Sequence, residues 1–199
     1  MIPAIDRLRS ERVVAVLQRL PDLDRVVDAL AEAGIGVVAV TLDTDDALAA
    51  IARLRERGDL TVLAGTVRTG AEAAAAVASG AEGCVGPAFV PAVVEQCLEL
   101  GVPSIPGALT PTEIEAAWRA GAAMVNVFPA GLGGPGYLRH VLAPLGEIPL
   151  LATGGVDARN ASEFLAAGAT AVGIGSSLSG AKDTGAEARR ILAAVRQAS

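Results

Sequence analysis

The feature that most constrains the fold is a phrase that recurs along the chain. Each copy is an Ala-rich stretch of helical character, then a glycine, then a short run of β-branched residues. The glycines of five copies are Gly34, Gly80, Gly101, Gly121 and Gly168. A glycine just past a helix readily adopts the left-handed conformation that turns the chain toward its next element. Each copy therefore predicts a helix, a cap and a strand.

Other short apolar runs complete a series of eight expected strands. They are Val13 to Leu17, Val37 to Thr41, Thr61 to Ala64, Cys84-Val85, Ser104-Ile105, Met124 to Phe128, Leu150 to Ala152 and Ala171 to Ile174. A helix follows each strand at a spacing of roughly twenty residues per unit, which predicts parallel pairing with right-handed crossovers. Eight units favour an α/β fold, the (β/α)₈ TIM barrel, with a doubly wound open sheet as the alternative.

Length and composition agree with one domain. The 199 residues are 52% apolar but only 3% aromatic, so the core must be built from many small side chains. No low-complexity linker divides the chain, and we expect a single barrel domain over residues 1–199.

Net charge and cysteine content limit the kinds of ligand and partner that the protein is expected to bind. A net charge of -6 argues against nucleic acid or an anionic membrane, since those surfaces attract clustered cations. The two cysteines are too few for a disulfide framework, and no apolar run is long enough to span a bilayer. No ligand motif of specific spacing predicts a metal site or a cofactor. A cytoplasmic protein with a small-molecule ligand is expected.

Two glycine-bearing turns follow the last two expected strands. They are Thr153-Gly154-Gly155 and Gly175-Ser176. Phosphates commonly bind between the loops after strands seven and eight of a barrel, where glycine lets backbone N–H groups approach an anion. These five residues are the predicted phosphate-binding set, although such glycines also serve tight turns alone.

Several phrases from about residue 13 to 177 resemble the 2-keto-4-hydroxyglutarate/2-keto-3-deoxy-6-phosphogluconate (KDPG) aldolase family. The phrases are Val13-Val14-Ala15-Val16-Leu17, Val40-Thr41-Leu42, Ala64-Gly65-Thr66-Val67, Ile105-Pro106-Gly107, Thr110-Pro111-Thr112-Glu113, Phe128-Pro129-Ala130, Thr153-Gly154-Gly155 and Gly175-Ser176. The resemblance implies a homotrimer that performs class I aldol chemistry through a lysine Schiff base. It also implies a phosphate ligand for the two glycine-bearing turns.

The residues that carry this family's chemistry are replaced. Asn126 occupies the position of the Schiff-base lysine, Ala39 replaces a glutamate, and Asp43 replaces an arginine that holds the keto-acid carboxylate. An amide nitrogen cannot condense with a ketone, so Asn126 cannot be the nucleophile. Lys182, the only lysine, is expected in a solvated segment beyond the eighth strand.

Other residues at the ends of the strands are candidates for different chemistry. Asp43 is predicted to act as an acid or base, with Asn126, Thr66 and Thr41 as polar positioning groups. A carboxylate at position 43 would repel a keto acid, which favours a ligand with hydroxyl or amino groups. Thr44 is expected to cap the next helix, with Asp45 and Asp46 in its first turn. The glycine-rich segment 131–136 is either a flexible loop that closes over a ligand or a passive connector.

Three functions remain open. The first is a divergent lyase-like enzyme that acts on a phosphorylated small molecule without a Schiff base. The second is a non-catalytic binder of phosphorylated metabolites or an assembly subunit. The third is an orthodox 2-keto-acid aldolase that releases pyruvate.

Overall fold

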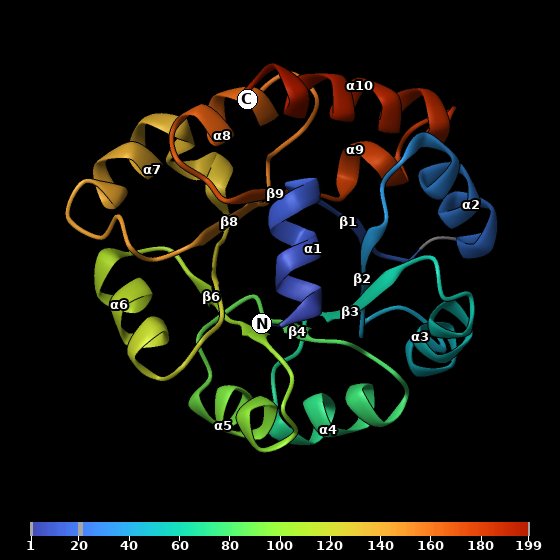
Figure 1. The fold of residues 1–199 in the computed structure, drawn as a ribbon, viewed down its shortest axis with the longest axis horizontal. Helices are drawn as coiled ribbons and strands as arrows, with labels where there is room; N and C mark the ends of the chain where they lie inside the picture. Colours follow the sequence, from blue (N-terminus) through green and yellow to red (C-terminus); the bar gives the residue numbers. More distant parts are fainter. Residues whose placement is uncertain (1, 20–21, 199) are drawn as a thin grey trace.

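The protein is an α/β barrel of parallel strands surrounded by helices, as predicted. The computed structural model describes residues 2–19 and 22–198, so residues 1, 20–21 and 199 of the predicted domain lie outside the described part. The strands hydrogen-bond in the order β5-β4-β3-β2-β1-β9-β8-β7-β6, and every pair is parallel. Figure 1 looks along the barrel and shows the helices as a ring around the strands.

The strands match the expected runs to within about two residues at each end. Their bounds are β1 Val13–Leu17, β2 Val37–Thr41, β3 Thr61–Gly65, β4 Cys84–Val85, β5 Ser104–Ile105, β6 Gly107–Ala108, β7 Val125–Val127, β8 Leu150–Thr153 and β9 Ala171–Ile174. The helices are α1 Pro3–Glu11, α2 Leu23–Ala33, α3 Ala47–Glu56, α4 Gly70–Ala78, α5 Pro91–Glu99, α6 Pro111–Arg119, α7 Gly134–Leu142, α8 Ala161–Ala166, α9 Ser176–Ser179 and α10 Thr184–Gln197, with a 3₁₀ turn η1 at Ala130–Leu132. The five glycines of the repeated phrase all have positive φ, from 70° at Gly101 to 107° at Gly168, which confirms their role as caps.

The ninth strand is β6, a second short strand that was not predicted and that follows the expected fifth strand directly after Pro106. Proline has no N–H to donate, so the ladder is interrupted there. β5 pairs with β4 on one side, while β6 pairs with β7 on the other. The Pro106 carbonyl accepts the Asn126 N–H at 2.8 Å. The segment from β5 to β6 therefore closes the barrel.

Helix α1 was not predicted, and it covers the amino-terminal end of the barrel. Figure 1 shows it across the centre of the ring. Its residues Ala4, Ile5 and Leu8 are buried against inward-facing side chains of the strands, among them Val14 and Leu63. The apolar interior is thus sealed at this end, and only the opposite end of the barrel remains for a ligand.

A larger apolar layer lies between the strands and the outer helices. It contains the alternate residues of each strand, such as Val38 and Val40 of β2, packed against helix residues including Phe164. The two cysteines, Cys84 and Cys97, are free and buried. No helix in the described part is long and apolar enough to cross a membrane.

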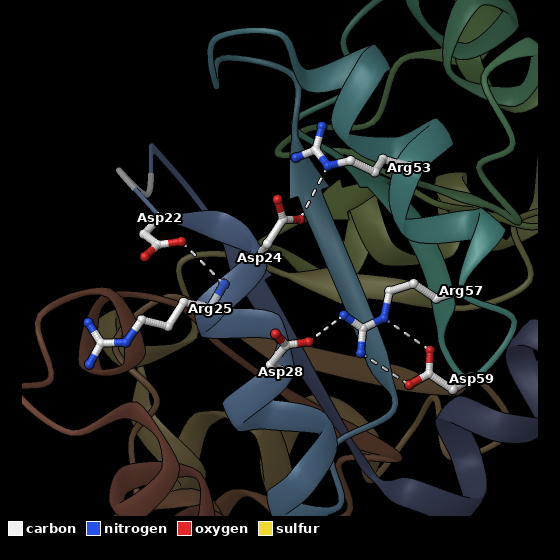
Figure 2. A network of polar contacts seen from close by, with 7 residues as sticks. All are labelled: Asp22, Asp24, Arg25, Asp28, Arg53, Arg57 and Asp59. Atoms are coloured by element: carbon white, nitrogen blue, oxygen red, sulfur yellow. Dashed lines mark hydrogen bonds and ion pairs between the residues drawn. The ribbon is translucent and has the colours of Figure 1, made fainter.

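Charged side chains connect neighbouring helices on the outside. Figure 2 shows Arg57, just after α3, between Asp28 of α2 and Asp59. Its Nη1 lies 2.6 Å from Asp28 Oδ1, and its Nε lies 3.2 Å from Asp59 Oδ1. These bonds raise the pKa of Arg57, first through Asp59, so the guanidinium stays charged. The network fixes α2 and α3 on one side of the barrel.

Candidate functional site

A cavity of about 250 Å³ opens at the carboxyl-terminal ends of the strands. Its lining residues are Val16, Gln18, Ala39, Thr41, Gly65, Thr66, Val85, Gly86, Pro87, Asn126, Phe128, Thr153, Gly154, Gly155, Val156, Gly173, Gly175 and Ser176. Eight of the nine predicted site residues are in this set, and Asp43 is not. Gln18 was not predicted as a site residue, although its position directly after the first strand was the available signal.

The two predicted phosphate turns lie side by side at the cavity. Gly154 and Gly155 both have φ of 80°, a conformation that residues with a Cβ rarely adopt. Neighbouring strand β9 leads through Gly175 into α9, which begins at Ser176 as expected. Strands β8 and β9 pair directly, with Thr153 opposite Gly173. The two turns leave backbone exposed near the start of α9. The first N–H groups of any helix have no hydrogen-bond partner within that helix.

Asn126 is held rigidly inside the barrel. It is 3% exposed, its Nδ2 donates to the Gly86 carbonyl at 3.0 Å, and its Oδ1 accepts from Thr153 Oγ1 at 2.6 Å. The orientation of the amide follows from this pattern, because a carbonyl oxygen can only accept. Asn126 therefore joins β7 to β8 and to the loop after β4. One hydrogen of its Nδ2 remains for a ligand.

Two threonines complete the polar part of the lining. Thr41 Oγ1 donates to the Leu17 carbonyl at 3.2 Å and lies 3.1 Å from Thr44 Oγ1. Thr66 follows β3 with φ of 58°, an unusual conformation for a β-branched residue. Strained backbone of this kind gathers at functional sites, where the surrounding structure maintains it.

Asp43 lies beside the cavity and is engaged by its neighbours. Its Oδ2 accepts from Gln18 Nε2 at 3.0 Å and lies 3.1 Å from Arg19 Nη2. The hydrogen bond from Gln18, together with Arg19, holds the pKa of the Asp43 carboxyl below its ordinary value. A carboxylate that stays ionised is a poor general acid and a weak base. The geometry gives Asp43 contact with Gln18, which lines the cavity, and not with the cavity itself.

The expected helix cap after Asp43 is wrong. Helix α3 begins at Ala47, and Asp46 precedes it with positive φ and no side-chain capping bond. Thr44 Oγ1 instead accepts the Arg19 N–H at 3.0 Å. Thr44 thus joins the loop after β2 to the loop after β1. Its hydroxyl accepts from the backbone of Arg19 and does not cap the helix.

The cavity contains no obvious group for covalent or metal chemistry. None of its lining residues in the described ranges carries an ionisable side chain. Lys182 is exposed between α9 and α10, as expected, and lines a separate surface depression beside Asp183. Within residues 2–19 and 22–198 no cluster of His, Cys, Asp and Glu suits a metal ion.

The glycine-rich segment 131–136 is folded and not an open loop. It forms the end of η1 and the start of α7. Gly131 donates its N–H to the Gly154 carbonyl at 2.8 Å. A Cβ on Gly131 would lie 3.0 Å from the Gly155 Cα, so close packing requires glycine there. The segment packs against the predicted phosphate turn at Gly154 and Gly155.

Comparison with known proteins identifies the family. The family model described as KDPG and KHG aldolase matches residues 4–193. The chain belongs to the KDPG and KHG aldolase family. A 2-dehydro-3-deoxy-phosphogluconate aldolase of Treponema pallidum is 39% identical over 83% of this chain and 81% of its own length. A probable 2-dehydro-3-deoxy-6-phosphogalactonate aldolase of Rhizobium meliloti is 34% identical over 83% of this chain and 81% of its own.

Solved structures of this aldolase family have the same fold. A 4-hydroxy-2-oxoglutarate aldolase/2-deydro-3-deoxyphosphogluconate aldolase from TTHB1 superimposes with a TM-score of 0.87 at 33% identity, covering 96% of this chain and 98% of that one. The native KDPGal structure gives a TM-score of 0.89 at 27% identity, covering 94% and 95%. The family resemblance inferred from the sequence is therefore confirmed.

Proposed function

We propose that this member of the aldolase family binds a phosphorylated small molecule at the barrel mouth without forming a Schiff base. One observation carries the proposal. The cavity is lined by glycine backbone, hydroxyls and amides, and no lining residue in the described part has an ionisable side chain. Such a surface can bind an anion through dipoles, but it offers no amine to attack a ketone.

The phosphate end is supported by the geometry of its turns. Gly154 and Gly155 keep backbone exposed at the end of β8, and Ser176 presents a hydroxyl at the start of α9. The relatives named above act on phosphorylated sugar acids according to their names. We therefore assign Thr153, Gly154, Gly155, Gly175 and Ser176 as the phosphate-binding set.

Among the described residues that line the cavity there is no lysine, so none of them can form a Schiff base with a ketone. The position that the family resemblance assigns to the lysine holds Asn126, whose amide is fixed by two hydrogen bonds. Asp43, the sequence candidate for acid or base, lies outside the lining. Reversible binding therefore fits the geometry better than lyase chemistry through Asp43. A lyase remains the second candidate because the named relatives are aldolases.

Calorimetric titration tests the phosphate assignment. Ser176→Asp places a negative charge at the proposed phosphate position, and we expect it to weaken binding of a sugar phosphate by tenfold or more through charge repulsion. Ser179→Asp is the matched control, since Ser179 lies exposed on the same short helix outside the lining. Equal binding by both variants and the unchanged chain would contradict the assignment.

Borohydride trapping tests the chemistry. We expect no covalent adduct when the protein is reduced with pyruvate or 2-dehydro-3-deoxy-6-phosphogluconate, and no release of pyruvate from the latter. An adduct on any residue, located by mass spectrometry, would establish the orthodox aldolase instead. Release of pyruvate without an adduct would favour the divergent lyase.

The oligomer and the location are also proposals. The family resemblance implies a homotrimer, while the cysteine content and the net charge of -6 favour a cytoplasmic location with no nucleic acid or membrane partner. Sedimentation equilibrium would give three times the chain mass of 19.9 kDa if the trimer forms.

A further inference from the structure

The inner wall of the cavity has a definite hydrogen-bond polarity. This wall consists of Gln18, Thr41, Asn126 and Thr153, and it is formed by strands β7, β8 and β2 and the residue after β1. A hydroxyl has one hydrogen to donate, whereas its oxygen can accept twice. Which partner receives each hydrogen therefore decides what the wall can offer a ligand.

The hydrogens of both wall hydroxyls are committed within the protein. Thr153 Oγ1 must donate to Asn126 Oδ1, because the amide is oriented by the Gly86 carbonyl and its oxygen can only accept. Thr41 Oγ1 donates to the Leu17 carbonyl, which also can only accept. Neither hydroxyl therefore has a hydrogen left for a ligand, and Thr41 Oγ1 also accepts from Thr44 Oγ1 at 3.1 Å. Each hydroxyl can only accept from a ligand.

The two amides of the wall supply its remaining donors. Gln18 commits one amide hydrogen to the Asp43 carboxylate, and Asn126 commits one to Gly86. Each amide keeps one hydrogen, and Gln18 keeps its carbonyl oxygen. The charge of Asp43 behind Gln18 is paired with Arg19 at 3.1 Å. No cation of the described chain lines the cavity.

We infer that the inner wall prefers a ligand hydroxyl to a carboxylate, so that the ligand is a phosphorylated polyol and not a phosphorylated keto acid. This inference rests on the proposed phosphate site. A hydroxyl can donate to Thr41 or Thr153 while it accepts from Asn126. A carboxylate can accept from Asn126 and Gln18, but it has no hydrogen for Thr41 or Thr153, which leaves both of these hydroxyl oxygens without a ligand donor.

Two phosphate esters of the same configuration at C2 differ in this group alone. sn-Glycerol 3-phosphate has a terminal hydroxymethyl group where L-3-phosphoglycerate, the 3-phosphoglycerate used here, has a carboxylate. In calorimetric titrations of the full chain, we expect glycerol 3-phosphate to bind about tenfold more tightly or better. Equal affinity, or tighter binding of 3-phosphoglycerate, would overturn the inference and leave the proposed phosphate site intact. If neither ester nor inorganic phosphate binds, the proposed function fails and this inference fails with it.

Thr41→Val removes the wall hydroxyl and keeps its shape. We expect it to lower the preference for glycerol 3-phosphate at least threefold by weakening that ester selectively. Thr44→Val is the matched control, because Thr44 belongs to the same hydrogen-bonded group but does not line the cavity. An unchanged preference in Thr41→Val, or the same fall in both variants, would show that the wall hydroxyl does not select the ligand. If Thr41→Val does not fold, the comparison of the two esters on the unchanged chain decides.

Discussion

At the scale of single residues, buried polar side chains in this barrel differ in whether they are satisfied. Asn126 bonds at both ends of its amide, whereas the equally buried Ser104 Oγ has no partner among the described residues. Removing a satisfied amide leaves its partners unpaired in the interior, while removing an unpaired hydroxyl relieves a desolvation cost.

Asn126→Leu should therefore be strongly destabilising. It leaves the Gly86 carbonyl and the Thr153 hydroxyl without their partner, and we expect the free energy of unfolding to fall by about 2–4 kcal/mol. Ser104→Ala is the control and should change it by less than about 0.5 kcal/mol or raise it. Urea denaturation measures both, and equal losses in the two variants would contradict this account.

Glu113 gives a prediction about pH. Its carboxylate accepts the backbone N–H groups of Thr110 and Leu109, and these bonds, Thr110 first, hold the pKa of Glu113 below its ordinary value. Because the pKa is lower in the folded chain, the stabilisation is complete above the ordinary carboxyl range and is lost as pH falls through the lowered pKa.

Glu113→Gln should remove this acid sensitivity. The unchanged chain should be more stable than Glu113→Gln by about 0.5 kcal/mol at pH 7, since an exposed charge is screened by solvent. The difference should shrink as the pH falls through the lowered pKa of Glu113 and vanish below it. Stability measured against pH tests this, with Glu95→Gln as control because Glu95 is exposed on α5 and its carboxylate makes no hydrogen bond within the described chain. A difference that persists unchanged into acid would contradict the assignment.

The sequence predicted which residues reach the cavity wherever their position at the end of a strand is sufficient to bring them there. Thr153 is the last residue of β8, Gly155 and Ser176 follow the ends of β8 and β9, and parallel strands bring such residues to one end of a barrel. Asp43 follows the same rule but lies outside the cavity lining. Its side chain is drawn toward Gln18 and Arg19, and partners that come from another strand are not visible in a local pattern.

At the scale of elements, the eight repeated units were predictable and two features were not. The first is the short strand β6 after Pro106, which is recognised only from its pairing with β7, whereas β5 pairs with β4. Helix α1 was missed because Asp6, Arg7 and Arg9 dominate its sequence, while the few apolar residues that matter gather on one face. The burial of that face can be recognised only when the barrel is known to close and to leave an open end that the helix covers.

The role of α1 as a cover leads to a prediction. Leu8 is fully buried against the barrel interior, so Leu8→Ala should lower the free energy of unfolding by about 2–4 kcal/mol through lost burial and a cavity. Ile2 precedes the same helix but is 43% exposed, and Ile2→Ala should cost about 0.5 kcal/mol or less. Chemical denaturation compares the two. A small loss in Leu8→Ala would mean that the barrel is stable without its cover.

At the scale of the whole molecule, closure determines how the chain should unfold. Strand β9, near the carboxyl end, pairs with β1 near the amino end, and the segment from β5 to β6 joins the two halves on the other side. No cut through the sequence therefore leaves a piece whose strands keep all their neighbours. A molecule of this kind should lose its structure as one unit.

We therefore expect a single unfolding transition that all probes report at the same urea concentration. Trp118, the only tryptophan, lies on α6 in the middle of the chain, so its fluorescence reports on one sector of the ring. Far-UV circular dichroism reports on every helix, including α2 and α10, which pack together where the two ends of the chain meet. Coincident midpoints would support the single domain predicted over residues 1–199. A fluorescence change that precedes or follows the loss of helix would mean that part of the ring unfolds separately. The pairing between neighbouring strands would then be too weak to make the two halves unfold together.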